Sequence, residues 1–171
     1  MKRLCTIFIF AISSLWLGGC INDDVPGRRE VVRVGDSLPD FAITMNDGSV
    51  VTGESLRKSV AVVLFFHTTC PDCQQLLPQI QPLYDEYSPR GVAFALIGRE
   101  ESAASVAAFW SAHNLTMPYS PQEDRAVYSL FAKSLIPRVY ISDNEGRVRY
   151  IFTDDPVPSY AEIESALDTI L

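Results

Sequence analysis

Residues 60–73 decide the fold, and their sequence is VAVVLFFHTTCPDC. Residues 60–66 are all apolar and rich in β-branched and aromatic side chains, which is typical of a strand covered on both faces. Cys70 and Cys73 follow closely, and Pro71 between them suits the first turn of a helix, where its missing N–H costs nothing. The stretch therefore predicts a buried strand that leads into a CxxC motif at the start of a helix.

A helix with one buried face is predicted after the motif. Its apolar side chains recur at the i, i+3, i+4, i+7 spacing of one helix face. They are Leu76, Leu77, Ile80, Leu83, Tyr84 and Tyr87. The sequence Pro89-Arg90-Gly91 ends the helix. Residues 92–97, again all apolar, predict a second buried strand directly after it.

The rest of the chain predicts more helices and a strand pair. Helices are expected over residues 102–114, 122–132 and 159–171, and strands over residues 138–142 and 148–152. Ser102 is a suitable N-cap for the first of these helices. The turn sequence Asp143-Asn144-Glu145-Gly146 joins the two strands as a hairpin.

The part of the chain before residue 60 predicts short strands. Residues 31–34 are expected to form the first of them. The turn sequence Asn46-Asp47-Gly48-Ser49 predicts a hairpin between residues 41–45 and 50–52. All these elements together predict one α/β domain over residues 31–171. Its mixed central sheet is flanked by helices and preceded by a strand and hairpin extension.

Residues 1–19 have the pattern of an export signal. Two basic residues precede an apolar run that is short for a bilayer span, and small residues follow it. A buried N-terminal helix is the alternative, but the basic start and the lack of a polar face disfavour it. Residues 20–30 are polar, contain proline and glycine, and are expected to form a flexible tether.

The sequence Leu17-Gly18-Gly19-Cys20 resembles the bacterial lipobox, in which the chain is cleaved before the cysteine and the sulfur is lipidated. This resemblance implies a lipid on Cys20 that anchors the chain to a bacterial membrane, facing the periplasm. Cys5 would leave with the signal. Cys70 and Cys73 would then be the only free pair, which leaves no cysteines for a structural disulfide framework.

The composition excludes some classes of partner. The formal net charge of −7 and the lack of a basic cluster argue against binding to nucleic acid. A hydrophobic fraction of 47% and a charged fraction of 20% are those of an ordinary globular protein.

The CxxC motif has the placement that dithiol chemistry needs. The N-terminus of a helix has unpaired N–H groups and the positive end of the helix dipole, which favour a thiolate on Cys70. Cys70 is thus the expected nucleophile toward a disulfide, and Cys73 would resolve the mixed disulfide. In the reverse direction, a partner's thiol would attack the Cys70–Cys73 disulfide.

A metal site is the competing interpretation of the motif. Cys70, Cys73 and His67 could hold zinc with a fourth ligand, and His113 is the only other histidine. Structural zinc sites usually bring a second Cys/His pair, so neither a metal nor another cofactor is expected here.

The chain resembles thioredoxin-fold proteins and, more closely, the TlpA-like membrane-tethered thiol–disulfide oxidoreductases. The resemblance runs from about Val34 to the C-terminus. It rests on Gly35-Asp36, Pro39-Asp40-Phe41, Cys70-Pro71-Asp72-Cys73, Pro78, Ile136-Pro137 and the Asp143–Gly146 turn. The resemblance implies that Pro137 is cis and faces Cys70, and that the peptide of Ile136 helps to dock an extended substrate.

The sequence departs from that family at two acidic positions. Thioredoxins have a buried aspartate where this chain has Leu64, and TlpA-like reductases often have a glutamate where it has Leu76. Asp72 is then the nearest proton acceptor for Cys73 in the sequence. A carboxylate there disfavours a nearby thiolate, which destabilises the reduced form and favours a reductase or isomerase over a strong oxidant. The alternative is that Asp72 only caps the helix.

Two further residues are candidates for the site. Arg138 follows Pro137 and could guide acidic or polar partner segments past Cys70, or could be a solvated cation at the end of a strand. It also stands where peroxiredoxins, which resemble this fold, often have an arginine. His67 is expected at the end of a strand, where it could tune Cys70.

Three functions follow, in order of preference. The first is thiol–disulfide exchange that reduces or reshuffles disulfides of exported proteins in the cell envelope, with electrons from a membrane-embedded donor. The second is a thiol peroxidase, which the residues Val63 and His67 disfavour because peroxiredoxins have proline and threonine there. The third is a metal-binding lipoprotein.

Overall fold

The computed structural model of the protein describes residues 30–171. Its five-stranded sheet has the strand order β5-β4-β3-β6-β7. These strands are β5 (Tyr119–Ser120), β4 (Ala93–Gly98), β3 (Ala61–Phe66), β6 (Arg138–Ser142) and β7 (Val148–Phe152). β3 pairs in parallel with β4 and antiparallel with β6, so the sheet is mixed, as predicted. The predicted signal, Cys20 and most of the predicted tether lie outside the described residues.

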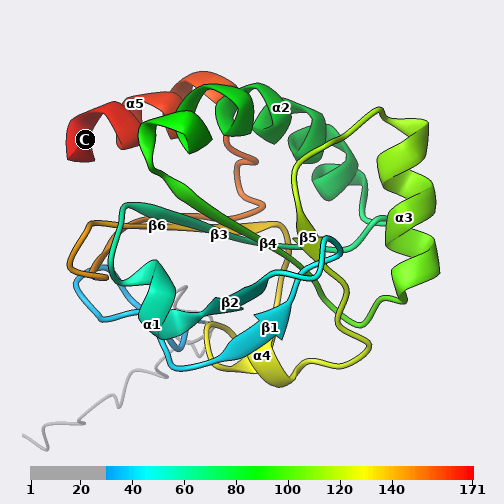
Figure 1. Cartoon of the computed structure of the whole chain (residues 1–171), viewed down its shortest axis with the longest axis horizontal. Coiled ribbons are helices and arrows are strands. Elements are labelled where there is room, and N and C mark those ends of the chain that lie inside the picture. Colours follow the sequence, from blue (N-terminus) through cyan, green and yellow to red (C-terminus); the bar gives the residue numbers. More distant parts are fainter. Residues whose placement is uncertain (1–29) are drawn as a thin grey trace, which may run out of the picture.

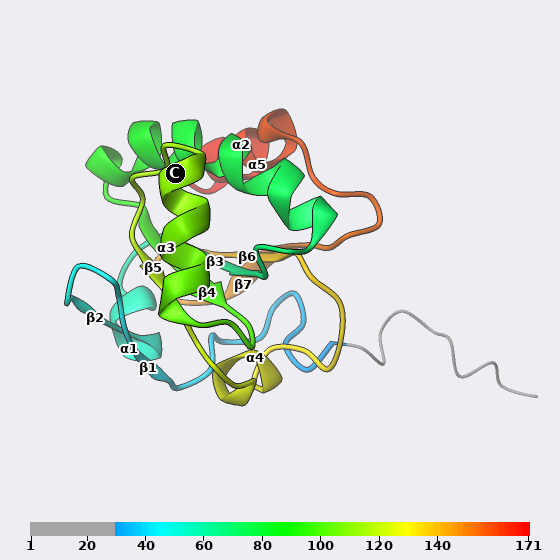
Figure 2. The same cartoon turned by 90° about the vertical axis from the view of Figure 1, so that its right-hand side faces the viewer.

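The helices cover the sheet in layers (Figure 1). Helices α2 (Pro71–Tyr87) and α5 (Tyr160–Ile170) lie side by side on one face. The opposite side has the hairpin of β1 (Ala42–Thr44) and β2 (Val50–Thr52), with α1 (Gly53–Leu56) and α4 (Ala126–Ser129). Helix α3 (Ala103–Ala112) stands beside the β4–β5 edge and faces the viewer in Figure 2. A short 3-10 turn, Ser88–Arg90, follows α2.

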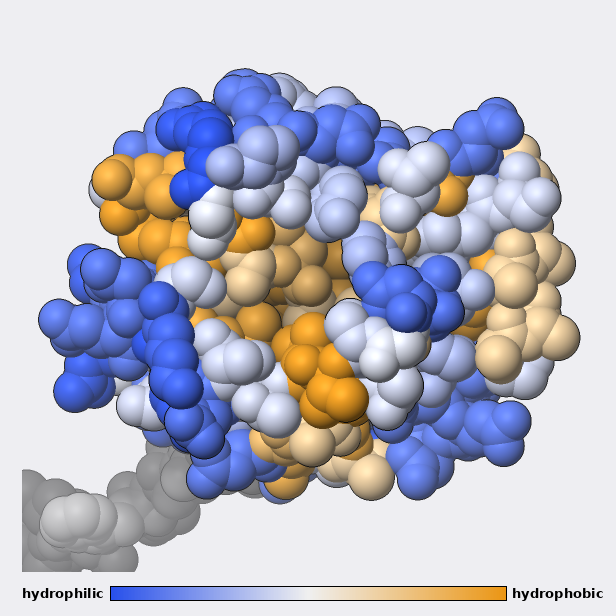
Figure 3. All heavy atoms as spheres, viewed as in Figure 1, coloured by the Kyte–Doolittle hydropathy of each residue, from blue (hydrophilic) through white to orange (hydrophobic). Residues whose placement is uncertain are grey.

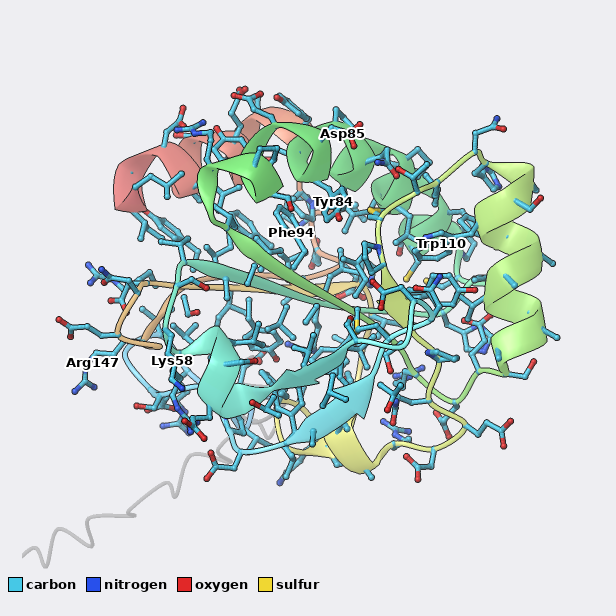
Figure 4. All side chains as sticks on the ribbon, viewed as in Figure 1. Lys58, Tyr84, Asp85, Phe94, Trp110 and Arg147 are labelled. Atoms are coloured by element: carbon cyan, nitrogen blue, oxygen red, sulfur yellow. The ribbon has the colours of Figure 1, made fainter. Side chains whose placement is uncertain are left out.

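The central strand β3 organises two apolar layers because its side chains alternate between the faces of the sheet. All its residues are buried. On the α2 face, Phe66 packs against Trp110 of α3, and the rings of Tyr84 and Phe94 meet edge to face with centroids 5.4 Å apart (Figure 4). On the other face, Phe65 contacts the rings of Tyr128, Phe131 and Tyr140. Strand β3 is therefore fixed from both sides.

Helix α3 buries large side chains and exposes small ones. Val106 and Trp110 are buried, and Trp110 points inward in Figure 4. The exposed alanines of this helix form a pale, weakly apolar surface at the right of Figure 3; they are Ala103, Ala104, Ala107, Ala108 and Ala112. Hydrophilic side chains gather at the left of that view, where Lys58 and Arg147 lie near the start of β3.

Two predicted elements are wrong. Residues 31–34 do not form a strand, because the Asp36 carboxylate accepts a hydrogen bond from Arg33 N at 2.8 Å and turns the chain. The helix predicted over residues 122–132 is limited to Ala126–Ser129. There, the carboxylate of Asp124 accepts from Ala126 N at 2.8 Å, so that the helix begins late.

Candidate active site

The CxxC motif lies where β3 passes into α2. Cys70 is the N-cap of the helix and Pro71 its first residue, as the sequence predicts. No side-chain hydrogen bond caps the helix, so its first N–H groups have no side-chain acceptor. Cys70 is half-buried and Cys73 is fully buried, and both are free thiols. The two sulfurs thus differ in access.

The environment of Cys73 keeps its thiol neutral. Burial is the largest effect and raises the pKa of Cys73 far above its ordinary value. The neighbouring Cys70 and the Asp72 carboxylate raise this pKa further, whereas a hydrogen bond from the backbone of His67 lowers it. Cys73 therefore remains protonated until a base removes its proton, which is the behaviour expected of a resolving cysteine.

The segment before β6 faces the motif. The Ile136–Pro137 peptide bond is cis, as the family resemblance implies. The sulfur of Cys70 donates to the carbonyl oxygen of Ile136 at 3.7 Å. Residues separated by 66 positions in the sequence are thus brought together beside the reactive sulfur.

Asp72 does not cap the helix with its side chain. It lies in the first turn of α2, but the N-cap is Cys70 and no side-chain capping hydrogen bond forms. The carboxylate is half-buried and close enough to Cys73 to raise its pKa. Its electrostatic effect on the Cys73 thiol is therefore the better-supported of the two interpretations of Asp72.

Glu101 is a buried carboxylate that the sequence analysis missed. Only 4% of this residue is exposed, and it lies just after β4, at the same edge of the sheet as the motif. Its oxygens accept hydrogen bonds from the backbone N–H of Thr68, at 3.0 and 3.2 Å, and from the Thr68 hydroxyl. The sequence could have indicated this position, because Glu101 follows a predicted strand and the carboxyl ends of neighbouring parallel strands meet at one edge of a sheet.

Comparison with known proteins shows to which family the chain belongs. The family model described as Redoxin matches residues 33–171. The chain belongs to the Redoxin family. This confirms the predicted thioredoxin fold and the thiol–disulfide oxidoreductase class.

Several relatives of this redoxin are thiol–disulfide enzymes. It is 26% identical over 143 residues to the thiol-disulfide oxidoreductase ResA of Geobacillus kaustophilus, which covers 84% of this chain and 81% of the relative. It is 21% identical over 147 residues to ResA of Bacillus thuringiensis, with 86% and 85% covered.

Solved structures match the fold of the redoxin. A Bacteroides thetaiotaomicron protein, proposed to be a protein disulfide isomerase, aligns with a TM-score of 0.77 and 26% identity over 84% of this chain and 92% of that one. A thioredoxin-family thiol:disulfide interchange protein of Chlorobium tepidum aligns with a TM-score of 0.69 and 21% identity, over 81% and 97%.

Arg138 of the redoxin is not where the sequence analysis expected it. Only 1% of the residue is exposed, so it is neither a solvated cation nor a guide for substrate beside Cys70. Arg138 pairs with Phe65 in the β3–β6 ladder, so it points to the face of the sheet opposite α2. There its guanidinium binds the carboxylate of Glu30.

The two histidines of the redoxin differ in their relation to the motif. His67 Nδ1 accepts from Thr69 N at 3.2 Å and lies 3.8 Å from Glu101, so His67 is part of the loop before Cys70. That His67 tunes Cys70 stays a prediction. His113 stacks on Phe109 at the end of α3, with ring centroids 4.1 Å apart.

Among residues 30–171 of the redoxin, no group of three or more histidine, cysteine, aspartate or glutamate side chains is arranged to hold a metal ion. No helix in the same range combines the length and the apolar character that a membrane span requires.

Proposed function

We propose that this redoxin reduces or reshuffles disulfides of exported proteins in the cell envelope, with Cys70 as the attacking and Cys73 as the resolving cysteine. The observation that carries the assignment is the difference between the two sulfurs. Cys70 is half-buried beside the carbonyl of Ile136, whereas Cys73 is fully buried and its pKa is raised. A partner's disulfide can thus reach one sulfur and not the other.

The exchange proceeds in two balanced steps. The Cys70 thiolate attacks one sulfur of the partner's disulfide, which forms a mixed disulfide and releases the partner's other sulfur as a thiolate. Cys73 then loses its proton, for which the Asp72 carboxylate is the nearest acceptor in the sequence, and attacks the Cys70 sulfur. This step forms the Cys70–Cys73 disulfide and releases the partner's second thiolate. The partner gains two electrons, and the redoxin loses them.

The Asp72 carboxylate favours the reducing direction. A negative charge in the motif disfavours a neighbouring thiolate, so the reduced form is less stable and the reduction potential is lower. In an oxidising compartment such a reductant needs a continuing source of electrons. A membrane-embedded dithiol donor would supply them.

The N-terminal sequence supports attachment near such a donor. A lipid on Cys20, as the lipobox resemblance implies, would hold the domain at the membrane surface through residues 20–30. Such a tether would raise the effective concentration of the redoxin around a donor in the same membrane.

Trapping of mixed disulfides tests the assignment of the cysteines. The full-length Cys73→Ser variant, purified in detergent, is expected to form a stable mixed disulfide with an oxidised protein substrate, because it cannot resolve it. The matched Cys70→Ser variant is expected to form none. A Cys70→Ser variant that traps as much substrate as Cys73→Ser would contradict the assignment.

The redox direction is tested by the reduction potential of the Cys70–Cys73 couple, measured against glutathione or dithiothreitol buffers. A reversible two-electron couple well below the potential of strongly oxidising exported proteins, about −120 mV, is expected. The Asp72→Asn variant is expected to have a higher potential than the wild type. A wild-type potential near −120 mV would contradict the assignment as a reductant.

A further inference from the structure

An ion pair between the buried Arg138 and the partly exposed Glu30 joins the start of the described domain to the segment that faces Cys70. The guanidinium of Arg138 binds the Glu30 carboxylate through Nη1 and donates through Nε to the carbonyl of Ser134 at 2.9 Å. Two donors on one rigid planar group thus fix two acceptors in different directions, which a lysine ammonium cannot reproduce. Ser134 belongs to residues 131–137, here called the docking segment, which ends at the cis proline Pro137.

Tyr140 completes this cluster. Its side chain lies on the same face of β6 as Arg138, two residues further along. The Tyr140 hydroxyl is 3.2 Å from Glu30 Oε2 and 3.3 Å from the carbonyl oxygen of Phe131. Burial raises the pKa of Tyr140, so the hydroxyl remains a donor. The Glu30 carboxylate therefore accepts from two side chains of one strand.

The docking segment is held at several points along its length. Glu30 forms an antiparallel bridge with Ala132 at its start. Near its end, Leu135 has a φ of 74°, a backbone region that a residue with a side chain rarely adopts. The Tyr128 hydroxyl donates to the carbonyl of that same Leu135 at 2.6 Å. The next carbonyl, that of Ile136, contacts the sulfur of Cys70.

We propose that Glu30 and Arg138 are positioning residues that hold the docking segment so that Ile136 and Pro137 present a protein substrate to Cys70. The proposal rests on the proposed disulfide exchange and adds the residues that align its substrate. The pair is a poor source of net stability, because desolvation of the buried Arg138 guanidinium offsets much of its attraction to Glu30. Its two-directional geometry is better explained by the need to place Ser134 and the residues after it.

The pair also lies where the chain enters the domain. Glu30 is the last residue of the predicted tether, and in the structure it already bridges to the docking segment. The entry point of the chain and the substrate-facing segment are thus parts of one hydrogen-bonded cluster.

Two kinds of disulfide distinguish positioning from general structure. The reduced full-length protein, in detergent, is mixed with a disulfide-bonded peptide or with 5,5′-dithiobis(2-nitrobenzoate). The small aromatic disulfide needs only an accessible Cys70, whereas the peptide also needs the docking segment. The variants are Glu30→Gln and Arg138→Lys, with Tyr140→Phe as a milder third that removes only one hydroxyl.

The expected result is a selective loss. The second-order rate constant for this single-turnover reduction of the peptide falls about tenfold or more in Glu30→Gln and Arg138→Lys, mainly through weaker binding of the peptide, and falls less in Tyr140→Phe. The rate with the small disulfide stays within about twofold. The control variant Arg57→Lys weakens a different ion pair, with Asp40 at 2.6 Å, and is expected to change neither rate.

Two outcomes would overturn the positioning role. One is a lower melting temperature in the variants with an unchanged ratio of the two rates, which is the result of a structural role only. The other is an equal loss with both disulfides, which would place the effect on the cysteines themselves. A wild-type protein that reduces neither disulfide is a separate result, because it refutes the disulfide exchange on which the proposal depends.

Discussion

The sulfur of Cys70 lies 3.7 Å from the carbonyl oxygen of Ile136, whose peptide bond to Pro137 is cis. The contact brings the start of α2 next to the segment that leads into β6. A reactive sulfur and the backbone directly before β6 thus share one small area. A partner whose extended chain pairs with this backbone would have its disulfide next to Cys70.

The difference in burial of the two cysteines predicts their reactivity toward alkylating reagents. With reduced protein at pH 8, iodoacetamide is expected to modify Cys70 first. Cys73 is expected to react far more slowly, because burial blocks the reagent and raises the pKa of its thiol. Peptide mass spectrometry of the two sites measures the ratio. In guanidinium chloride both should react alike, and faster labelling of Cys73 in the folded protein would contradict the assigned roles.

The hydrogen bonds of Glu101 predict a large effect on stability. The Glu101→Ala variant leaves the buried Thr68 N–H without its acceptor, so the free energy of unfolding should fall by about 2 kcal/mol. Urea denaturation measures the change. The neighbouring Glu100→Gln variant is the control, because that side chain makes only long ion pairs at the surface and should change stability by less than about 0.5 kcal/mol. Equal effects of the two variants would show that the Thr68 contact contributes little.

The Tyr87 hydroxyl predicts a loss of stability at alkaline pH. It donates to Asp168 at 2.7 Å, and burial together with this carboxylate raises the pKa of Tyr87 to about 12. An unfolded tyrosine titrates near 10, so this contribution is complete below pH 10 and is lost as the pH rises toward 12.

Replacement of Tyr87 isolates that contribution. The Tyr87→Phe variant should be less stable than wild type by about 1 kcal/mol at pH 8, with a smaller further loss between pH 10 and 12. The variant should keep part of the pH dependence through Tyr160, because the hydrogen bond to Glu164 raises the pKa of Tyr160 to about 12. Urea denaturation across this pH range tests both points, and parallel curves for wild type and variant would contradict them.

Substitution of Gly53 is expected to cause a steric clash with the backbone. A Cβ at this position would overlap the carbonyl oxygen of Pro39, which is backbone and cannot rotate away. The Gly53→Ala variant should therefore lose about 2 kcal/mol of stability, measured by thermal or urea unfolding. Gly98→Ala is the matched control, since its Cβ would meet nothing nearer than 3.6 Å. A Gly53→Ala variant as stable as Gly98→Ala would show that the backbone at Pro39 moves easily.

Elements with a strong local pattern could be predicted from the sequence. Residues 138–142 and 148–152 are strands β6 and β7 with the predicted bounds, because a turn sequence and apolar strands mark them locally. The strand and helix around the motif were found for the same reason. The short elements β5 and α1 were missed, because two to four residues are too few to show a period.

The surroundings of the motif depend on contacts that no local pattern reveals. Arg138 follows a predicted loop and resembles a surface cation, but the Glu30 that binds it lies 108 residues earlier in the chain. Its direction follows from the register of β6 on β3, which places it beside Phe65. Glu101 could have been suspected from the topology alone, since it follows a strand parallel to β3.

Cys70 and Cys73 are the only cysteines in residues 30–171, so no covalent cross-link outside the motif supports this part of the chain. Its folding then depends on apolar packing and hydrogen bonds, which do not change with the redox potential of the surroundings. Any thiol signal from the folded domain therefore originates in the motif. A variant with both cysteines replaced by serine could form no disulfide in this part of the chain, and every thiol-dependent property of the domain can be measured against it.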